Sequence, residues 1–185
     1  MADQDKNDGI ELYRSGRYIE AYPFLLNAES NGSLDARFCL AFMLEKGLGT
    51  TLDIHGALTR YKKIRDAGAP VGAYHAGLVL EKLGRFEEAV ENHKFASERN
   101  YVASSYAIYR LWKMGRKEVQ EQDAQEYFEK ALSGGHVYAK RDRVHMMLKG
   151  KFGLLGIIRA LPLFIRGVYE TAMLRKNDQH SSKLN

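Results

Sequence analysis

The sequence predicts an all-α protein made of stacked antiparallel helix pairs, and three observations lead to that prediction. Glycines recur at intervals of 31 to 37 residues, at Gly16, Gly47, Gly84 and Gly115. An apolar run at helical spacing precedes each of these glycines, and an alanine-bearing run follows it. The chain has only three prolines, and few of its runs alternate as strands do. Self-similarity at this period indicates helix pairs that each bury an apolar face against the next pair.

Two of the units match residue by residue. The first has Gly9, Gly16, Tyr18, Ala21 and Ala28, and the third has Gly77, Gly84, Phe86, Ala89 and Ala96 at the same spacing. Small residues seven apart lie on one side of a helix, where they let a neighbouring helix approach. In both units a Gly-Arg-aromatic turn ends the first helix and places a ring between the two helices of the pair.

The second and fourth units have longer turns. One runs from Gly47 to Asp53 ahead of Ala57, and the other runs from Gly115 to Asp123 ahead of Ala124. The short-turn units resemble tetratricopeptide repeats. The long-turn units resemble the Sel1-like repeat, a relative with a longer, glycine-bearing turn. The resemblance covers roughly residues 5–150. It implies a right-handed α-solenoid of about four repeats followed by a C-terminal capping or docking helix.

The expected helices follow from the apolar periodicity and from the glycine and proline positions. They are 4–15, 18–31, 34–46, 54–67, 71–83, 86–99, 102–114, 122–133 and 137–149. Gly32, Gly68 and the Gly134-Gly135 pair lie where second helices of the pairs should end, so we expect left-handed caps there. Pro70 suits the first turn of its helix.

Charge separates the chain into three expected regions. They are a repeat array at 1–150, an apolar basic helical segment at 151–177 and a disordered tail at 178–185. The net charge is +5. Residues 137–185 contain ten Lys and Arg against three Asp and Glu, whereas the repeats are slightly acidic. A basic end of this kind indicates a solvated surface, or contact with an anionic surface or a partner.

Neither a catalytic motif nor a cofactor or metal site is predicted. The Gly47-Leu-Gly-Thr-Thr run lacks the Gly-Lys-Ser/Thr ending of a phosphate loop and has no strand before it. The six histidines form no ligand pair at zinc-binding spacing. Cys39 lies in an apolar helical stretch and is expected to be a core thiol. The acidic N-terminus does not resemble a secretory signal, so a cytoplasmic protein is expected.

In tetratricopeptide arrays the first helix of each pair lines a concave groove, and the resemblance carries that face over to this chain by position. The expected partner-binding residues are Tyr74, Leu78, Lys82, Tyr109, Trp112, Lys113, Arg141 and His145. Phe38 and Phe42 share that face but are assigned to the core. Tyr109 and Trp112 fit either packing or the groove. Rings flanked by cations suit a peptide or helix with apolar anchors and acidic groups.

The segment from Lys149 to Tyr169 is the most apolar part of the chain. Its expected membrane or docking residues are Ile157, Arg159, Leu161, Phe164, Arg166 and Val168. It is too short and too interrupted to span a bilayer. Three interpretations remain open. The segment caps the last repeat, lies in a membrane interface, or docks a partner or a second copy of the chain.

The leading functional hypothesis is a non-enzymatic scaffold or adaptor that binds a protein or peptide through the groove. The resemblance implies work at the cytoplasmic face of the inner membrane, in envelope or surface-polysaccharide assembly. One alternative is a metal-binding or enzyme-accessory protein. Another is a weak nucleic-acid-binding protein, prompted by the pI near 9.2. No nucleic-acid partner is expected, since an array that reads RNA is basic along its groove.

Overall fold

The computed structural model describes residues 2–153, 155–156, 158–162 and 165–166, and this part of the chain contains helices and no strand. The helices are α1 (Ala2–Arg14), α2 (Tyr18–Ser30), α3 (Leu34–Lys46), α4 (Ile54–Asp66), α5 (Pro70–Lys82), α6 (Phe86–Glu98), α7 (Val102–Lys113), α8 (Glu121–Ser133) and α9 (Val137–Leu148). The expected helix ends differ from these by at most two residues. The predicted all-α fold class is confirmed.

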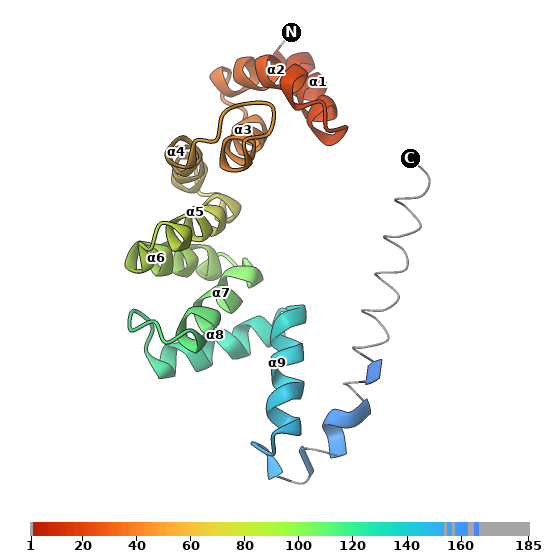
Figure 1. Cartoon of the computed structure of the whole chain (residues 1–185), viewed down its shortest axis with the longest axis vertical. Coiled ribbons are helices and arrows are strands. Elements are labelled where there is room, and N and C mark those ends of the chain that lie inside the picture. Colours follow the sequence, from red (N-terminus) through yellow and green to blue (C-terminus); the bar gives the residue numbers. More distant parts are fainter. Residues whose placement is uncertain (1, 154, 157, 163–164, 167–185) are drawn as a thin grey trace. The chain divides into compact units, whose positions relative to one another are not determined.

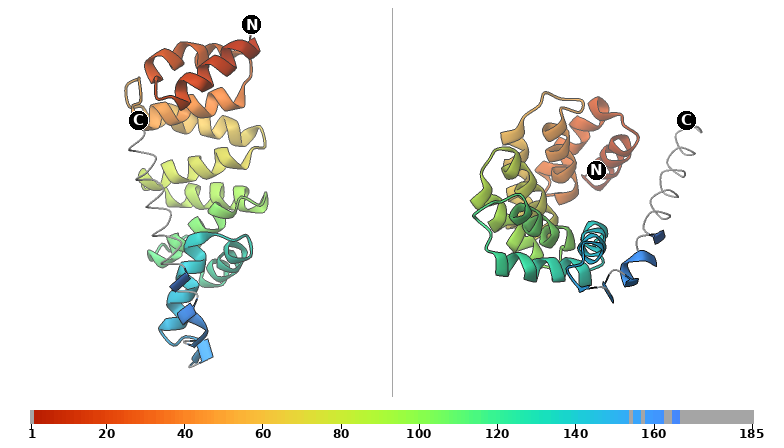
Figure 2. Two further views of the ribbon diagram at one scale, coloured as in Figure 1. Left: turned by 90° about the vertical axis from the view of Figure 1, so that its right-hand side faces the viewer. Right: turned by 60° about the horizontal axis from the view of Figure 1, so that its bottom comes forward.

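Helices pack in pairs, and the pairs pack on one another in chain order. α1 packs on α2, α3 on α4 and α5 on α6, while α2 with α3, α4 with α5 and α6 with α7 join successive pairs. Figure 1 shows these hairpins following one another from α1 to α7, and Figure 2 shows them from two further sides in red to green. Ala21 and Ala89, at matching positions in two repeats, are fully buried, as close helix contact requires.

The described chain forms two compact units, and their boundary lies inside α8. The first unit runs from Met1 to Tyr127, and the second begins at Phe128. The sequence-based boundary at residue 150 therefore falls within the second unit. Residues 167–185, including the expected tail at 178–185, lie outside the described residues.

Two apolar clusters lie in the described core of the first unit. Around α1 to α3 the cluster includes Leu25, Leu40 and Met43. Around α3 to α6 it includes Tyr61 and Leu80. Each buried large apolar side chain contributes about 1.5–3 kcal/mol, so packing within and between the helix pairs stabilises the array.

Residues in the left-handed conformation end most of the helices. The glycines expected as caps have positive φ angles, namely Gly32 at 88°, Gly68 at 89° and Gly135 at 81°. No glycine stands at the C-terminal end of α6, where Asn100 takes this conformation with φ of 62°. Asparagine tolerates the left-handed region better than most residues because its short polar side chain bonds locally.

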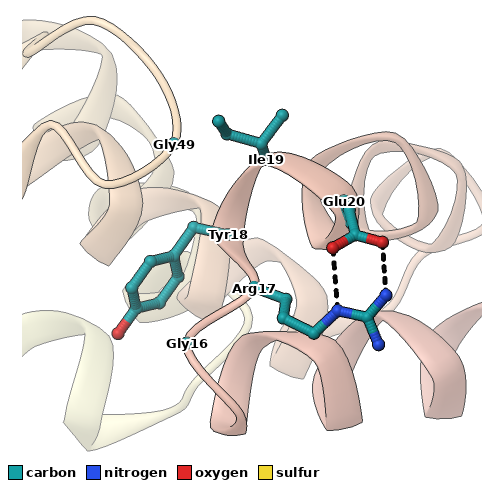
Figure 3. A pocket seen from close by; sticks show the side chains of 6 residues that line it. All are labelled: Gly16, Arg17, Tyr18, Ile19, Glu20 and Gly49. Atoms are coloured by element: carbon teal, nitrogen blue, oxygen red, sulfur yellow. Dashed lines mark hydrogen bonds and ion pairs between the residues drawn. The ribbon is translucent and has the colours of Figure 1, made fainter.

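The long turn between α3 and α4 lies against the N-terminus of α2. Gly49, with φ of 64°, is so close that a Cβ atom there would lie 2.6 Å from the backbone N of Ile19 and the carbonyl C of Tyr18. Figure 3 shows Gly49 beside these two residues. The glycine of the longer turn thus allows two adjacent repeats to touch backbone to backbone.

Candidate functional site

A hollow of about 450 Å³ opens on the face formed by the first helices of successive pairs. Its lining side chains come from α3, α5 and α7, and we call it the α3–α5–α7 hollow. They are Phe42, Glu45, Lys46, His75, Leu78, Glu81, Lys82 and Arg110. All of them belong to the first unit.

Glu45 is the polar centre of one side of the hollow. Its side chain is only 6 % exposed. The hydroxyl of Tyr61 donates to Oε2 at 3.1 Å, and the ammonium groups of Lys46 and Lys82 donate to Oε1. Tyr61 reaches it from α4, and Lys82 reaches it from the C-terminal end of α5. Three donors therefore satisfy a carboxylate that is almost closed off from water.

The hydrogen bonds keep Glu45 ionised. Burial by itself would raise the pKa of this carboxyl, but the bonds from Lys82, Lys46 and Tyr61 outweigh burial and leave the pKa below its usual value. Burial and the neighbouring Glu45 carboxylate raise the pKa of the Tyr61 hydroxyl, which stays protonated as the donor. A fixed negative charge at Glu45 holds both lysine heads at the rim.

Glu81 plays the same role on the other side. Arg110 Nη2 from α7 donates to both carboxylate oxygens, at 2.8 and 2.6 Å. The Nε2 of His93, a fully buried residue of α6, lies 2.9 Å from Glu81 Oε1. Side chains from α6 and α7 thus converge on the Glu81 carboxylate. This contact fixes the Arg110 guanidinium at the edge of the hollow.

The His75 ring lines the hollow and contacts two aromatic rings behind it. The His75 ring stacks on Tyr61 with centroids 5.1 Å apart and meets Phe38 edge-on at 4.9 Å. Burial lowers the pKa of His75, and the nearby Glu45 carboxylate opposes this only in part. His75 is therefore neutral at pH 7, and the positive charge of the site comes from Lys46, Lys82 and Arg110.

The open part of the hollow combines apolar surface with cations. The side chains of Lys46, Lys82 and Arg110 are 43, 51 and 39 % exposed. Phe42 and Leu78 lie between them and are half-buried. Such a surface can hold an apolar side chain and a carboxylate of the same ligand.

Two of the expected groove residues, Leu78 and Lys82, line the hollow. Tyr74 lies elsewhere, with its ring 5.0 Å from Tyr101 and 5.8 Å from His93. Phe42, assigned to the core from the sequence, lines the hollow instead, whereas Phe38 packs against the core as expected.

The three expected residues of α7 divide between core and surface. Tyr109 is 3 % exposed, so the structure places this ring in the packing between helices and corrects its assignment to an open groove. Trp112 is half-buried, with its ring 5.9 Å from Tyr109. Lys113 is exposed and lies 5.6 Å from the Tyr109 ring. The sequence left Tyr109 open between helix packing and the groove, and the structure shows that it packs between helices.

The remaining expected residues lie in the second unit. Arg141 and His145 are exposed on α9, and the Arg141 guanidinium lies 5.0 Å from the Tyr138 ring. Arg159, Leu161 and Arg166 are exposed as well. Ile157, Phe164 and Val168 lie outside the described residues.

Sequence reasoning missed five lining residues, namely Glu45, Lys46, His75, Glu81 and Arg110. A signal for two of them was present, since Glu45 and Lys46 follow Phe42 by three and four residues. That spacing puts them on one face of a helix. Charged residues on a helix face are most often solvated, however, and the partners of these carboxylates come from distant parts of the sequence.

Other features of the described chain offer less chemistry. A second hollow of about 280 Å³ lies at the turn shown in Figure 3, where Arg17 and Glu20 form an exposed ion pair beside Gly49. Within the described ranges no group of three or more His, Cys, Asp or Glu could hold a metal ion. Burial raises the pKa of Cys39 to about 11, so this thiol is not a ready nucleophile. Among the described residues, no helix has the length and apolar character needed to cross a membrane.

Comparisons with known proteins agree with the fold. No family model matches the sequence, and no curated protein matches it significantly. The structure is similar to a Sel1 repeat protein from Oxalobacter formigenes, with a TM-score of 0.74 and 24 % identity over 88 % of this chain and 69 % of that one. It is also similar to a protective antigen of uropathogenic Escherichia coli that displays an SLR fold, with a TM-score of 0.60 and 16 % identity over 91 % of this chain and 46 % of the antigen. The helix-pair solenoid predicted from the glycine spacing and the long turns is confirmed, and the chain shares the fold of these Sel1-like repeat structures.

Proposed function

We propose that this protein is a non-enzymatic scaffold that binds a segment of a partner protein in the α3–α5–α7 hollow. Sel1-like repeat proteins are generally protein-interaction scaffolds. The observation that carries the proposal is the pairing of open apolar surface, at Phe42 and Leu78, with three cations that two nearly buried carboxylates hold in place. Stacked repeats expose such faces because each first helix is covered by its neighbours on the other sides.

The chemistry of the hollow favours a partner segment with an apolar side chain next to a carboxylate. A lysine ammonium has three donors and an arginine guanidinium has five. Lys82 and Arg110 each direct part of these donors to Glu45 or Glu81, and their side chains are still half-exposed. A partner carboxylate at the rim completes this pattern, because charge-assisted hydrogen bonds are the stronger class.

Size and preorganisation support the same ligand. A hollow of about 450 Å³ is in the range that holds a small ligand or a few side chains. The cations are already held in position by Glu45 and Glu81, so binding a partner requires little further ordering of long side chains.

We further propose that the scaffold works at the cytoplasmic face of the inner membrane, in envelope or surface-polysaccharide assembly. The support is the family resemblance together with the basic, apolar segment after α9. That segment belongs to the second unit.

Selection from a displayed random-peptide library against the immobilised full chain tests the ligand class. We expect enrichment of peptides that carry Asp or Glu within a few positions of a large apolar residue. A selected peptide should bind at least about tenfold more weakly to a Lys46→Gln/Lys82→Gln variant, because each lost charge-assisted bond is worth about 1.5–3 kcal/mol. Enrichment of basic peptides, or of no sequence class, would contradict the proposal.

Matched variants separate loss of the hollow from loss of folding. Lys63→Gln/Lys117→Gln removes two exposed lysines of the same unit that do not line the hollow, and binding should be unchanged. Phe42→Ala removes apolar surface without removing a partner of Glu45 and should also weaken binding. Thermal unfolding of each variant shows whether it is folded. Trp112→Ala tests whether the binding surface extends along α7.

A further inference from the structure

The described part of the segment after α9 presents its large apolar residues outward. Leu155, Ile158, Leu161 and Ile165 are 56 to 68 % exposed. Ala160, by contrast, is fully buried, and Gly156 is buried as well. Among the described residues of this segment, the large apolar side chains thus face solvent while the small residues are buried. We call the four outward residues the apolar row.

Helical spacing explains why the exposed apolar row and the buried small residues occur in the same segment. The residues of the apolar row are three or four positions apart, so they share one side of a helix. Gly156 and Ala160 are four apart and share another side. A Cβ atom on Gly156 would lie 2.7 Å from the Cβ of Phe152, four residues earlier in the chain. Among the described residues, the small side is therefore buried and the row lies on the exposed side.

The charge around the row is strongly positive. Residues 128–166 contain eight Lys and Arg against two Asp and Glu. Arg159 and Arg166 each follow a residue of the row, and both are exposed, as are Lys149 and Lys151. Since Arg159 and Arg166 are seven apart, they lie along the same edge of the row, two turns from each other.

This combination selects one occupant among those that could cover an apolar surface. A second copy of the chain would bring like charges of the two copies close together unless acidic groups faced them, and this unit has only two acidic residues in its described part. An anionic bilayer supplies headgroup charge for the arginines and acyl chains for the row. We propose that the apolar row lies in the interface of an anionic lipid bilayer, with Arg159 and Arg166 at the level of the headgroups.

Flotation of the full chain with vesicles tests this. One set is phosphatidylcholine alone, and the other contains phosphatidylglycerol at about a third, a content that gives a strongly negative surface. We expect the protein to float with the anionic vesicles and to remain below the neutral ones, and we expect added salt to weaken flotation because surface charge is screened. Absence of flotation with anionic vesicles would overturn the proposal.

Variants assign the binding to the row. Ile158→Ser/Ile165→Ser should lower the vesicle-bound fraction at least about tenfold, because interfacial binding scales with buried apolar area. Arg159→Gln/Arg166→Gln should reduce binding to anionic vesicles only. The control Ile19→Ser/Leu52→Ser removes two equally exposed apolar residues from the first unit and should leave flotation unchanged. Equal loss in the control and the row variant would overturn the assignment.

Further measurements separate membrane binding from dimer formation and from misfolding. Sedimentation without lipid should give a monomer for the wild type, and a dimer that Ile158→Ser/Ile165→Ser dissolves would mean that a second copy covers the row and would overturn the proposal. Thermal unfolding verifies that the variants fold. The Lys46→Gln/Lys82→Gln variant should float like the wild type, so failure at the membrane and failure of the hollow are separate outcomes.

Discussion

The ring of His93 lies directly against Gly77, because a Cβ atom at residue 77 would lie 2.5 Å from the ring Cε1. The ring is fully buried, and its Nε2 contacts Glu81. The absence of a side chain at Gly77 thus lets His93 of α6 reach the Glu81 carboxylate, which also binds Arg110. A glycine inside α5, unfavourable for the isolated helix, is explained by this contact.

Replacing Gly77 with alanine should therefore destabilise the protein. Helix propensity alone favours alanine by up to about 1 kcal/mol. Overpacking against a buried ring costs about 1–3 kcal/mol, and the ring is held by Glu81 and cannot easily retreat. We expect a net loss in the free energy of unfolding, measured by urea denaturation.

The companion variant reveals the cause. In a His93→Ala background the added methyl group meets no ring, so Gly77→Ala should be neutral or stabilising there. Equal destabilisation in both backgrounds would mean that something other than the ring excludes a side chain at residue 77.

Gly49→Ala should cost more stability than Gly32→Ala. Both glycines have positive φ, so both substitutions carry a conformational cost of about 1–2 kcal/mol. A Cβ atom at Gly32 meets nothing within 4 Å, whereas at Gly49 it meets the backbone of Tyr18 and Ile19. The difference in unfolding free energy, about 1–3 kcal/mol, reports the contact between the two repeats. Equal costs would show that the turn does not press on α2.

Stability should fall as the pH is lowered through the ordinary range of histidine, and His75 should account for part of the fall. Its pKa is lower in the folded state, first because of burial, so the unfolded chain takes up its proton at a higher pH. Between the unfolded and the folded pKa, each pH unit then costs at most about 1.4 kcal/mol.

The variant His75→Phe keeps an aromatic ring on Tyr61 and Phe38 but does not titrate. Its stability, measured by denaturation between about pH 7.5 and 5.5, should therefore depend less on pH than that of the wild type. Identical pH dependence in the two proteins would show that His75 is protonated equally in both states.

Tyr61→Phe should destabilise the protein at neutral pH by about 1–3 kcal/mol, since a nearly buried carboxylate loses a donor. The pKa of Glu45 is held down in the folded protein by Lys82, Lys46 and Tyr61 against the opposing effect of burial. The contribution is therefore present above the unfolded pKa of a carboxyl and is lost as the pH falls through the folded pKa.

Denaturation at pH 7 and at about pH 3 compares the two conditions, and the deficit of Tyr61→Phe should shrink in acid. The exposed Tyr138 serves as the control, since Tyr138→Phe should change stability little at either pH. A deficit that stays constant with pH would mean that the hydroxyl stabilises the core independently of the charge on Glu45.

Local sequence patterns are enough to predict the helices and the order in which they stack. Apolar periodicity and the alanines at Ala21 and Ala89 are local signals, and a helix needs only the residues within a turn or two of each position. Glycine also marks most of the ends. The end of α6 at Asn100 is the exception, where a side chain adopts the conformation that glycine takes elsewhere.

Only the tertiary structure decided which polar residues form a site. Lys82 reaches Glu45 over 37 positions, and Arg110 reaches Glu81 over 29. From the sequence of its own helix alone, each of the Glu45 and Glu81 carboxylates would be assigned to the solvated surface. Stacking of the next repeat removes water from it and brings its counter-charge, while it draws Tyr109 into the core. Which charged residues become buried and paired depends on how neighbouring repeats pack in space. No local sequence pattern predicts it.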